Sequence, residues 1–239
     1  LQKRVVAARK ADAIGDVLLL CEHFPVITQG RNGKREHLLV SESGLRQRGV
    51  EFYETSRGGD VTYHGPGQIV GYPILQLAAI RKDVVWYVRS LEELMIRVTA
   101  EFGIAASREA GKTGIWVANG EEKDLTRSSQ RAQREERGAP EKLGAIGVHI
   151  SRWVTSHGFA YNVATDLRNF DLIVACGIAG RKATSLEKLL VRAVDAAEVK
   201  PRIANHFGEV FGLAMRRGSR EELIQQLERV EQAVEVPVS

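Results

Sequence analysis

Cysteine is scarce in this chain of 239 residues, which contains only Cys21 and Cys176. The two residues form no CxxC pair and the six histidines form no HExxH motif, so the sequence predicts no metal site, and we expect no cofactor. A low cysteine content is typical of proteins in a reducing compartment. We therefore expect a cytoplasmic protein with free thiols.

Long apolar segments are also absent. The longest apolar runs, at 17–21 and 69–77, have the length of strands, which argues against a membrane-spanning helix. The first residues, LQKRVVAARKA, lack the apolar centre of a signal peptide, and nothing in them indicates export. We expect a soluble protein that has no membrane partner.

Neither sign of charge dominates. The chain has 34 Lys and Arg residues against 30 Asp and Glu residues, a net charge of +4. Such a near balance indicates a mild preference for acidic partners and does not indicate nucleic-acid binding. The densest charged stretch mixes both signs with almost no apolar residue, so we expect residues 119–141 to form a solvated, mobile loop.

Hydrophobic periodicity predicts one α+β domain over residues 1–239, with a mixed or antiparallel sheet and flanking helices. The clearest helix runs from Asp83 to Phe102, with Asp83 as N-cap and Gly103 as stop. Residues 194–239 are expected to form a helical C-terminal segment, broken at Pro201 and at 212–218. Strands are expected at 17–21, 25–29, in three runs within 50–77, at 113–118, and in an antiparallel pair at 142–150 and 157–163.

Two common active-site motifs are missing, and three segments carry residues suited to chemistry. Without GxxxxGK[ST] a P-loop NTPase is disfavoured, and without GxSxG an α/β-hydrolase serine has no support. The Gly-rich stretch RGGDVTYHGPGQ at 57–68 can approach a ligand closely. Cys176 lies in the small-residue turn VACGIAG, and Lys142 lies where the charged loop meets a strand. Taken singly, each has a plain alternative: a structural turn, a buried cysteine and a solvated lysine.

Five blocks taken together are more specific: LLLCEHFPVITQGR, RGGDVTYHGPGQIVGYPI, KLGAIGVHI, HGFAYNV, and ACGI followed by TSL. In this order and spacing, over about residues 7–190, they resemble the lipoyl(octanoyl) transferases. The resemblance implies a fold like the catalytic domain of lipoate and biotin protein ligases. It also implies Cys176 as the nucleophile and Lys142 as its partner. The implied acyl-binding residues are Arg57, Gly58, Gly59, Asp60, Val61, Thr62, Tyr63, His64, Ala145, Ile146, Gly147, Gly158, Phe159 and Ala160.

The same resemblance implies a reaction and its partners. Cys176 would take an octanoyl or lipoyl group from acyl carrier protein as a thioester and pass it to a lysine of a lipoyl domain. The acceptors implied are the lipoyl domains of 2-oxoacid dehydrogenase E2 subunits and the H protein of glycine cleavage. We expect the enzyme to act as a monomer.

Two other enzyme classes and one binding module remain as alternatives. An ATP-dependent lipoate or biotin ligase has the same fold but needs no nucleophilic cysteine, and the GRGRxG motif of biotin ligases is absent here. An amidotransferase that moves octanoyl between two lipoyl-bearing proteins would also use a cysteine. A non-catalytic acyl-binding module would form no covalent adduct. A test of ATP dependence identifies a ligase, a direct test of the acyl donor identifies an amidotransferase, and a test of adduct formation identifies a binding module.

Overall fold

The computed structural model describes residues 1–118, 139–174 and 182–235, and it describes residues 234 and 235 by backbone alone. A six-stranded sheet forms its centre, in the order β1 (Val17–Cys21), β5 (Gln68–Ile74), β9 (Val154–Asn162), β8 (Glu141–Ser151), β7 (Lys112–Val117) and β6 (Ala106–Glu109). All neighbouring strands in it are antiparallel. A second sheet has the order β3 (Glu51–Glu54), β2 (Val26–Gln29) and β4 (Val61–His64), with β2 parallel to β3 and antiparallel to β4.

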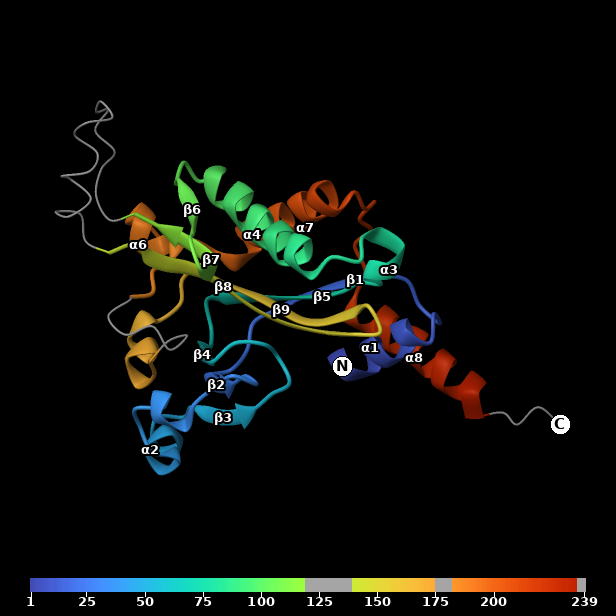
Figure 1. Ribbon diagram of the computed structural model, residues 1–239, viewed down its shortest axis with the longest axis horizontal. Coiled ribbons are helices and arrows are strands. Elements are labelled where there is room, and N and C mark those ends of the chain that lie inside the picture. The colour runs from blue at the N-terminus through green and yellow to red at the C-terminus, as the bar shows by residue number, and fades with distance from the viewer. Residues whose placement is uncertain (119–138, 175–181, 236–239) are drawn as a thin grey trace.

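Two long helices, α4 (Val84–Ala100) and α7 (Ala196–Phe211), cover one face of the six-stranded sheet (Figure 1). Their buried residues form the main core together with side chains of β5 and β9. The other face is covered in two parts. The small sheet and α2 (Glu42–Gln47) lie at one end, and α1 (Gln2–Lys10) with α8 (Arg220–Glu235) lie at the other. The predicted α+β class with a mixed sheet and flanking helices is confirmed.

The remaining elements are short. They are α3 (Leu77–Ile80), α6 (Leu186–Leu190) and two 3-10 helices, Arg35–His37 and Leu167–Leu172. In the described part of the chain no helix combines the length and the apolar character that a membrane span requires. The same residues contain no cluster of three or more side chains suited to holding a metal ion.

Helix α4 begins where the sequence predicts. The Asp83 carboxylate accepts a hydrogen bond from the Trp86 amide at 2.9 Å, which satisfies one of the amides left free at a helix start. Val84 at the start of the helix is 46% exposed, while Tyr87 and Leu94 are fully buried. The helix turns these two residues toward α7 and the sheet.

Helix α7 corrects the expected break at Pro201. Pro201 lies inside the helix on its exposed side, and the helix continues because Val199, Ile203 and Phe207 bury the opposite side in the main core. The packing outweighs the one backbone hydrogen bond that proline removes. The expected break after α7 is confirmed, since Gly212 ends the helix with a φ of 67°.

The predicted charged loop lies largely outside the described residues, which resume at residue 139. Its expected end at 141 is wrong, because Glu141 is already the first residue of β8 and is 7% exposed. The Lys188 ammonium of α6 donates to the Glu141 carboxylate at 2.7 Å. This carboxylate can be buried because Lys188 pairs with it. The local sequence could not predict this pair, since Lys188 lies 47 positions away in the chain.

Candidate functional site

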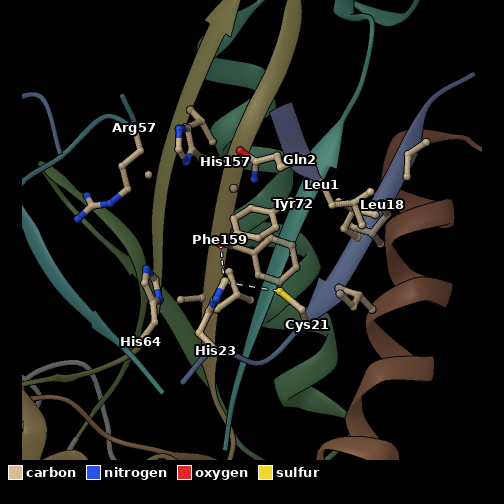
Figure 2. Close-up of a pocket in the computed structure, with 18 of the residues that line it drawn as sticks. Leu1, Gln2, Leu18, Cys21, His23, Arg57, His64, Tyr72, His157 and Phe159 are labelled. Carbon is tan, nitrogen blue, oxygen red and sulfur yellow. Dashed lines mark hydrogen bonds between the residues drawn. The ribbon is translucent and has the colours of Figure 1, made fainter. Parts of the chain in front are cut away.

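A cavity of about 2070 Å³ lies on the face of the six-stranded sheet that the small sheet covers. Side chains of β1, β5, β8 and β9 line it on one side, and β2, β4 and the loop before β4 line it on the other. Figure 2 shows Arg57, His64 and His157 around one part of it. The cavity also reaches Lys142 of β8.

Small side chains leave room for this cavity. The strand register places Ala145 of β8 opposite Ala160 of β9, and Ala160 opposite Val70 of β5. Directly paired residues of antiparallel strands point to the same face, so the three side chains form a floor across three strands. We call this floor and the space above it the slot. Alanine at two of its three positions keeps the slot deep.

The loop before β4 closes the slot along one side. The Gly58 amide donates to the Val148 carbonyl of β8 at 2.8 Å, which holds the loop against the sheet. A Cβ atom at Gly147 would lie only 2.9 Å from the Gly58 oxygen and 3.1 Å from Arg57 Cδ. Glycine at 147 thus permits this close approach of loop and strand.

Arg57 and Asp60 hold the same loop in place. Arg57 is 8% exposed, and its guanidinium donates to the backbone oxygen of Thr28 at 2.6 Å and to the Thr28 hydroxyl at 3.0 and 3.1 Å. The Asp60 carboxylate bonds His37 Nδ1 at 2.5 Å and accepts from the Lys34 amide at 3.2 Å. Both side chains line the cavity, yet most of their hydrogen-bonding capacity is used to fix the loop.

Two histidines of the cavity are neutral at pH 7. Burial lowers the pKa of His64 to about 4, although the Gln68 side chain that bonds its Nδ1 at 2.7 Å opposes this shift. Burial and the nearby Arg57 charge lower the pKa of His157 to about 4. His157 has a φ of 56°, and its Nε2 bonds Ser56 Oγ at 3.0 Å, so it ties the loop to β9. The cavity wall is therefore polar but uncharged at these positions.

Lys142 of β8 lines the cavity close to an aromatic ring. Its Nζ is 5.1 Å from the centroid of Trp116, the residue paired with it on β7. The Lys142 backbone pairs with the segment that precedes α6, since its amide donates to the Lys182 carbonyl and its carbonyl accepts from the Thr184 amide, both at 2.9 Å. The backbone of this half-buried lysine is thus hydrogen-bonded to residues 182 and 184, which follow the segment 175–181.

Comparisons with known proteins agree with this architecture. Residues 1–208 match the family model described as lipoyl protein ligase A/B catalytic domain. The chain belongs to this family. It is 50% identical over 221 residues to the octanoyltransferase of Acidobacterium capsulatum, covering 89% of this chain and 84% of the relative. It is 44% identical over 225 residues to the octanoyltransferase of Caldicellulosiruptor saccharolyticus, covering 93% and 87%.

Solved structures show the same fold at low identity. A lipoate-protein ligase A bound with ATP superposes with a TM-score of 0.66 at 14% identity, covering 97% of this chain and 90% of that one. A putative lipoate protein ligase from T. acidophilum with bound lipoic acid gives a TM-score of 0.65 at 12% identity, covering 97% and 90%. The predicted likeness to the lipoate ligase fold and the predicted family are both confirmed.

The structure of this family member brings most of the predicted site residues to one cavity. Those that line it are Lys142, Arg57, Gly58, Gly59, Asp60, Val61, Thr62, His64, Ala145, Ile146, Gly147, Gly158, Phe159 and Ala160. Cys176, the predicted nucleophile, lies outside the described residues. Tyr63 does not line the cavity, because alternation along β4 turns its ring into the core of the small sheet against Phe170.

Phe159 and Ile146 also differ from a simple lining role. Phe159 is 2% exposed and belongs to the main core, where its ring covers Gly71. Ile146, its partner on β8, packs against the same core. Their neighbours Ala145 and Ala160 point the other way and form the slot floor.

Sequence reasoning missed one group of cavity residues, Cys21, His23 and Tyr72. Figure 2 shows their side chains pointing toward one another. His23 Nε2 bonds the Tyr72 hydroxyl at 2.6 Å and lies 3.7 Å from Cys21 Sγ. Burial raises the pKa of Cys21 to about 11, so this thiol stays protonated near neutral pH. The sequence signals only that residues 21 and 23 are close together in the chain. Tyr72 is brought to them by the pairing of β1 with β5.

Proposed function

We propose that this chain is an octanoyltransferase of protein lipoylation, which moves an octanoyl group from acyl carrier protein to a lysine of a lipoyl domain. The observation that carries the proposal is the identity of 43–50% to four octanoyltransferases over 85% or more of the chain. A slot with an alanine floor that ends at a lysine supports the same activity. Acyl transfer onto lipoyl domains makes the chain an acyltransferase.

In the first step, the Cys176 thiolate attacks the carbonyl carbon of the donor thioester. A new S–C bond forms, the bond to the donor sulfur breaks, and the donor sulfur leaves with the proton of the Lys142 ammonium, so that Lys142 becomes neutral. A free thiol with a pKa near 8.5 is only about 3% thiolate at pH 7, so the nucleophile needs a cation beside it. Lys142 is suited to that role because it carries a positive charge at the mouth of the slot.

In the second step, the acceptor lysine attacks the octanoyl-cysteine carbonyl, an amide bond forms, and the cysteine sulfur leaves. The acceptor amine has a pKa near 10.4 and must lose protons to react. Lys142, neutral after the first step, accepts one proton as the amine attacks, and the sulfur leaves as a thiolate beside the restored ammonium, which leaves the enzyme ready for another cycle. Exchange of one thioester for another is nearly isoenergetic and formation of an amide is downhill, so the reaction needs no ATP.

Backbone anchors on both sides of 175–181 support a role for Cys176 beside Lys142. The Val174 amide donates to the His37 carbonyl at 2.8 Å, and Lys182 is bonded to Lys142. Cys176 precedes Lys182 by six positions, and a fully extended chain of that length spans at most about 21 Å. Covalent geometry therefore allows the thiol to reach the lysine.

The partners proposed are octanoyl-acyl carrier protein as donor and lipoyl domains of E2 subunits and of the glycine cleavage H protein as acceptors. One related structure pairs a bi-partite lipoate protein ligase with its E2 lipoyl domain. We propose that the enzyme works as a monomer in the cytoplasm.

Intact-protein mass spectrometry after incubation with octanoyl-acyl carrier protein tests the mechanism. We expect wild type and Cys21→Ala to gain the mass of one octanoyl group, removable by hydroxylamine, and Cys176→Ala to gain none. Lys142→Ala should form the adduct at least tenfold more slowly. An adduct that persists in Cys176→Ala rejects the nucleophile. Transfer that requires free octanoate and ATP instead identifies a ligase.

A further inference from the structure

The slot permits only one direction for an acyl chain that starts at Lys142. Along β8 and β9, the way toward Gly147 is blocked by the backbone of residues 57–58, which rests on the strand. The remaining path crosses the strands over Ala145 and Ala160 toward Val70. Neighbouring strands are about 4.8 Å apart, so this path is about 10 Å long from Ala145 to Val70.

Tyr72 lies beside the end of this path, where β1 places Cys21 opposite Val70. It follows Val70 by two residues on β5 and therefore points to the same face of the sheet. Its hydroxyl is held by His23 Nε2 at 2.6 Å, and the rings of the two residues are 5.9 Å apart in a T-shaped arrangement. Because the hydroxyl is hydrogen-bonded, the ring can face an apolar chain without leaving a polar atom unsatisfied.

The cavity does not end at Tyr72. On the far side of the ring lies the second core cluster, built from α1, α8 and the ends of β1 and β5, against which Tyr72 packs. The cavity continues there, lined by Gln2 of α1 and by Leu223 and Val230 of α8. Its volume of about 2070 Å³ exceeds the range of about 300–1,000 Å³ usual for small-ligand pockets. Tyr72 lies between the slot and this second part of the cavity, where Figure 2 shows Leu1, Gln2 and Leu18.

We infer that Tyr72 is the specificity-determining residue that limits the length of the acyl chain, and that His23 is the positioning residue that holds its ring across the slot. The inference rests on the proposed function. The ligand class is a saturated straight-chain acyl group whose terminal methyl contacts the ring. Burial of a further CH₂ is favourable wherever space is available, so the ring, and not poor solvation, would exclude a chain longer than eight carbons.

The test compares kcat/KM for hexanoyl-, octanoyl-, decanoyl- and dodecanoyl-acyl carrier protein. Tyr72→Ala should raise the dodecanoyl-to-octanoyl ratio about tenfold or more, because the slot then opens toward α1 and α8. Tyr72→Phe keeps the ring and should retain the wild-type preference. His23→Ala should broaden it by a smaller factor. If Tyr72→Ala does not fold, Tyr72→Val provides the same test with a residue that favours strands.

Ile69→Ala is the matched control, because Ile69 lies on the same strand as Tyr72 but points into the main core. It should destabilise the fold and leave the chain-length preference unchanged. Binding of free octanoate and dodecanoate by calorimetry gives a readout that does not require turnover. Tyr72→Ala that transfers octanoyl with the wild-type preference overturns the inference alone. If the wild-type enzyme transfers no acyl group, the proposed function is overturned. The calorimetric comparison of octanoate with dodecanoate in wild type and Tyr72→Ala then still tests whether Tyr72 limits chain length.

Discussion

The two faces of the six-stranded sheet differ in the size of the side chains they carry. Phe159 and Tyr161 of β9 point toward α4 and α7 and are buried in the main core. Ala160, which lies between them, points the other way and forms part of the slot floor. Because successive residues of a strand alternate between faces, one strand supplies both the core and the site.

The difference indicates where each face can tolerate change. The core face is filled, so removal of atoms leaves cavities and costs stability. The slot face is left open by small residues, so addition of atoms obstructs the substrate at a lower cost to folding. Stability and activity should therefore respond to opposite changes in side-chain size.

Filling the slot should have the largest effect on activity. Ala160→Leu places a branched side chain on the floor and should reduce kcat/KM for octanoyl transfer about 100-fold, or about 2.7 kcal/mol of activation free energy. Steady-state kinetics measure this loss, and Ala160→Gly, which keeps the slot open, serves as control. An Ala160→Leu enzyme with wild-type activity would show that the acyl chain lies elsewhere.

Moving the loop should have an intermediate effect. Gly147→Ala places a Cβ atom 2.9 Å from the Gly58 oxygen, so the loop of residues 57–58 has to shift away from β8. We expect KM for the acyl donor to rise about tenfold, or about 1.4 kcal/mol, with a smaller change in kcat. Ala145→Gly, which removes a Cβ on the same strand, is the control. Unchanged kinetics in Gly147→Ala would argue that the loop does not bound the slot.

The two neutral histidines of the cavity should make the stability of the fold depend on pH. The pKa values of His64 and His157 are lowered to about 4 in the folded chain, so the unfolded chain binds more protons below pH 6.5. The free energy of unfolding should therefore fall as the pH decreases from 6.5 toward 4, by about 1 kcal/mol per histidine over the first pH unit. Urea denaturation at several pH values measures this. His64→Gln should weaken the dependence, and an equal slope in that variant would contradict the assignment.

Much of the fold follows from local patterns. Strands β1, β8 and β9 and helix α4 lie where apolar periodicity predicts them, because each buries a regular face in the core. Pro201 shows the limit of such reasoning, since a buried face of α7 overrides its helix-breaking tendency. Glu141 shows the same limit, because its burial depends on Lys188 far along the chain.

The site follows from the sequence only in part. Motif order predicted the loop at 57–60, His64, Lys142 and the alanines of β8 and β9, all of which line one cavity. Motif order alone assigned Tyr63 to the site with His64, whereas strand alternation places its ring in the core of the small sheet. His23 and Tyr72 were not predicted, because 49 positions separate them and only the pairing of β1 with β5 brings them together.

By itself, the sequence determined the family, the order of the elements and the chemical groups available, because these depend on residue identity and local spacing. Only the tertiary structure decided which of those groups share a cavity, which direction from Lys142 stays open and which ring closes it. These features depend on strand register and on contacts between distant residues, and a shift of one residue in register would exchange the face of every side chain on a strand.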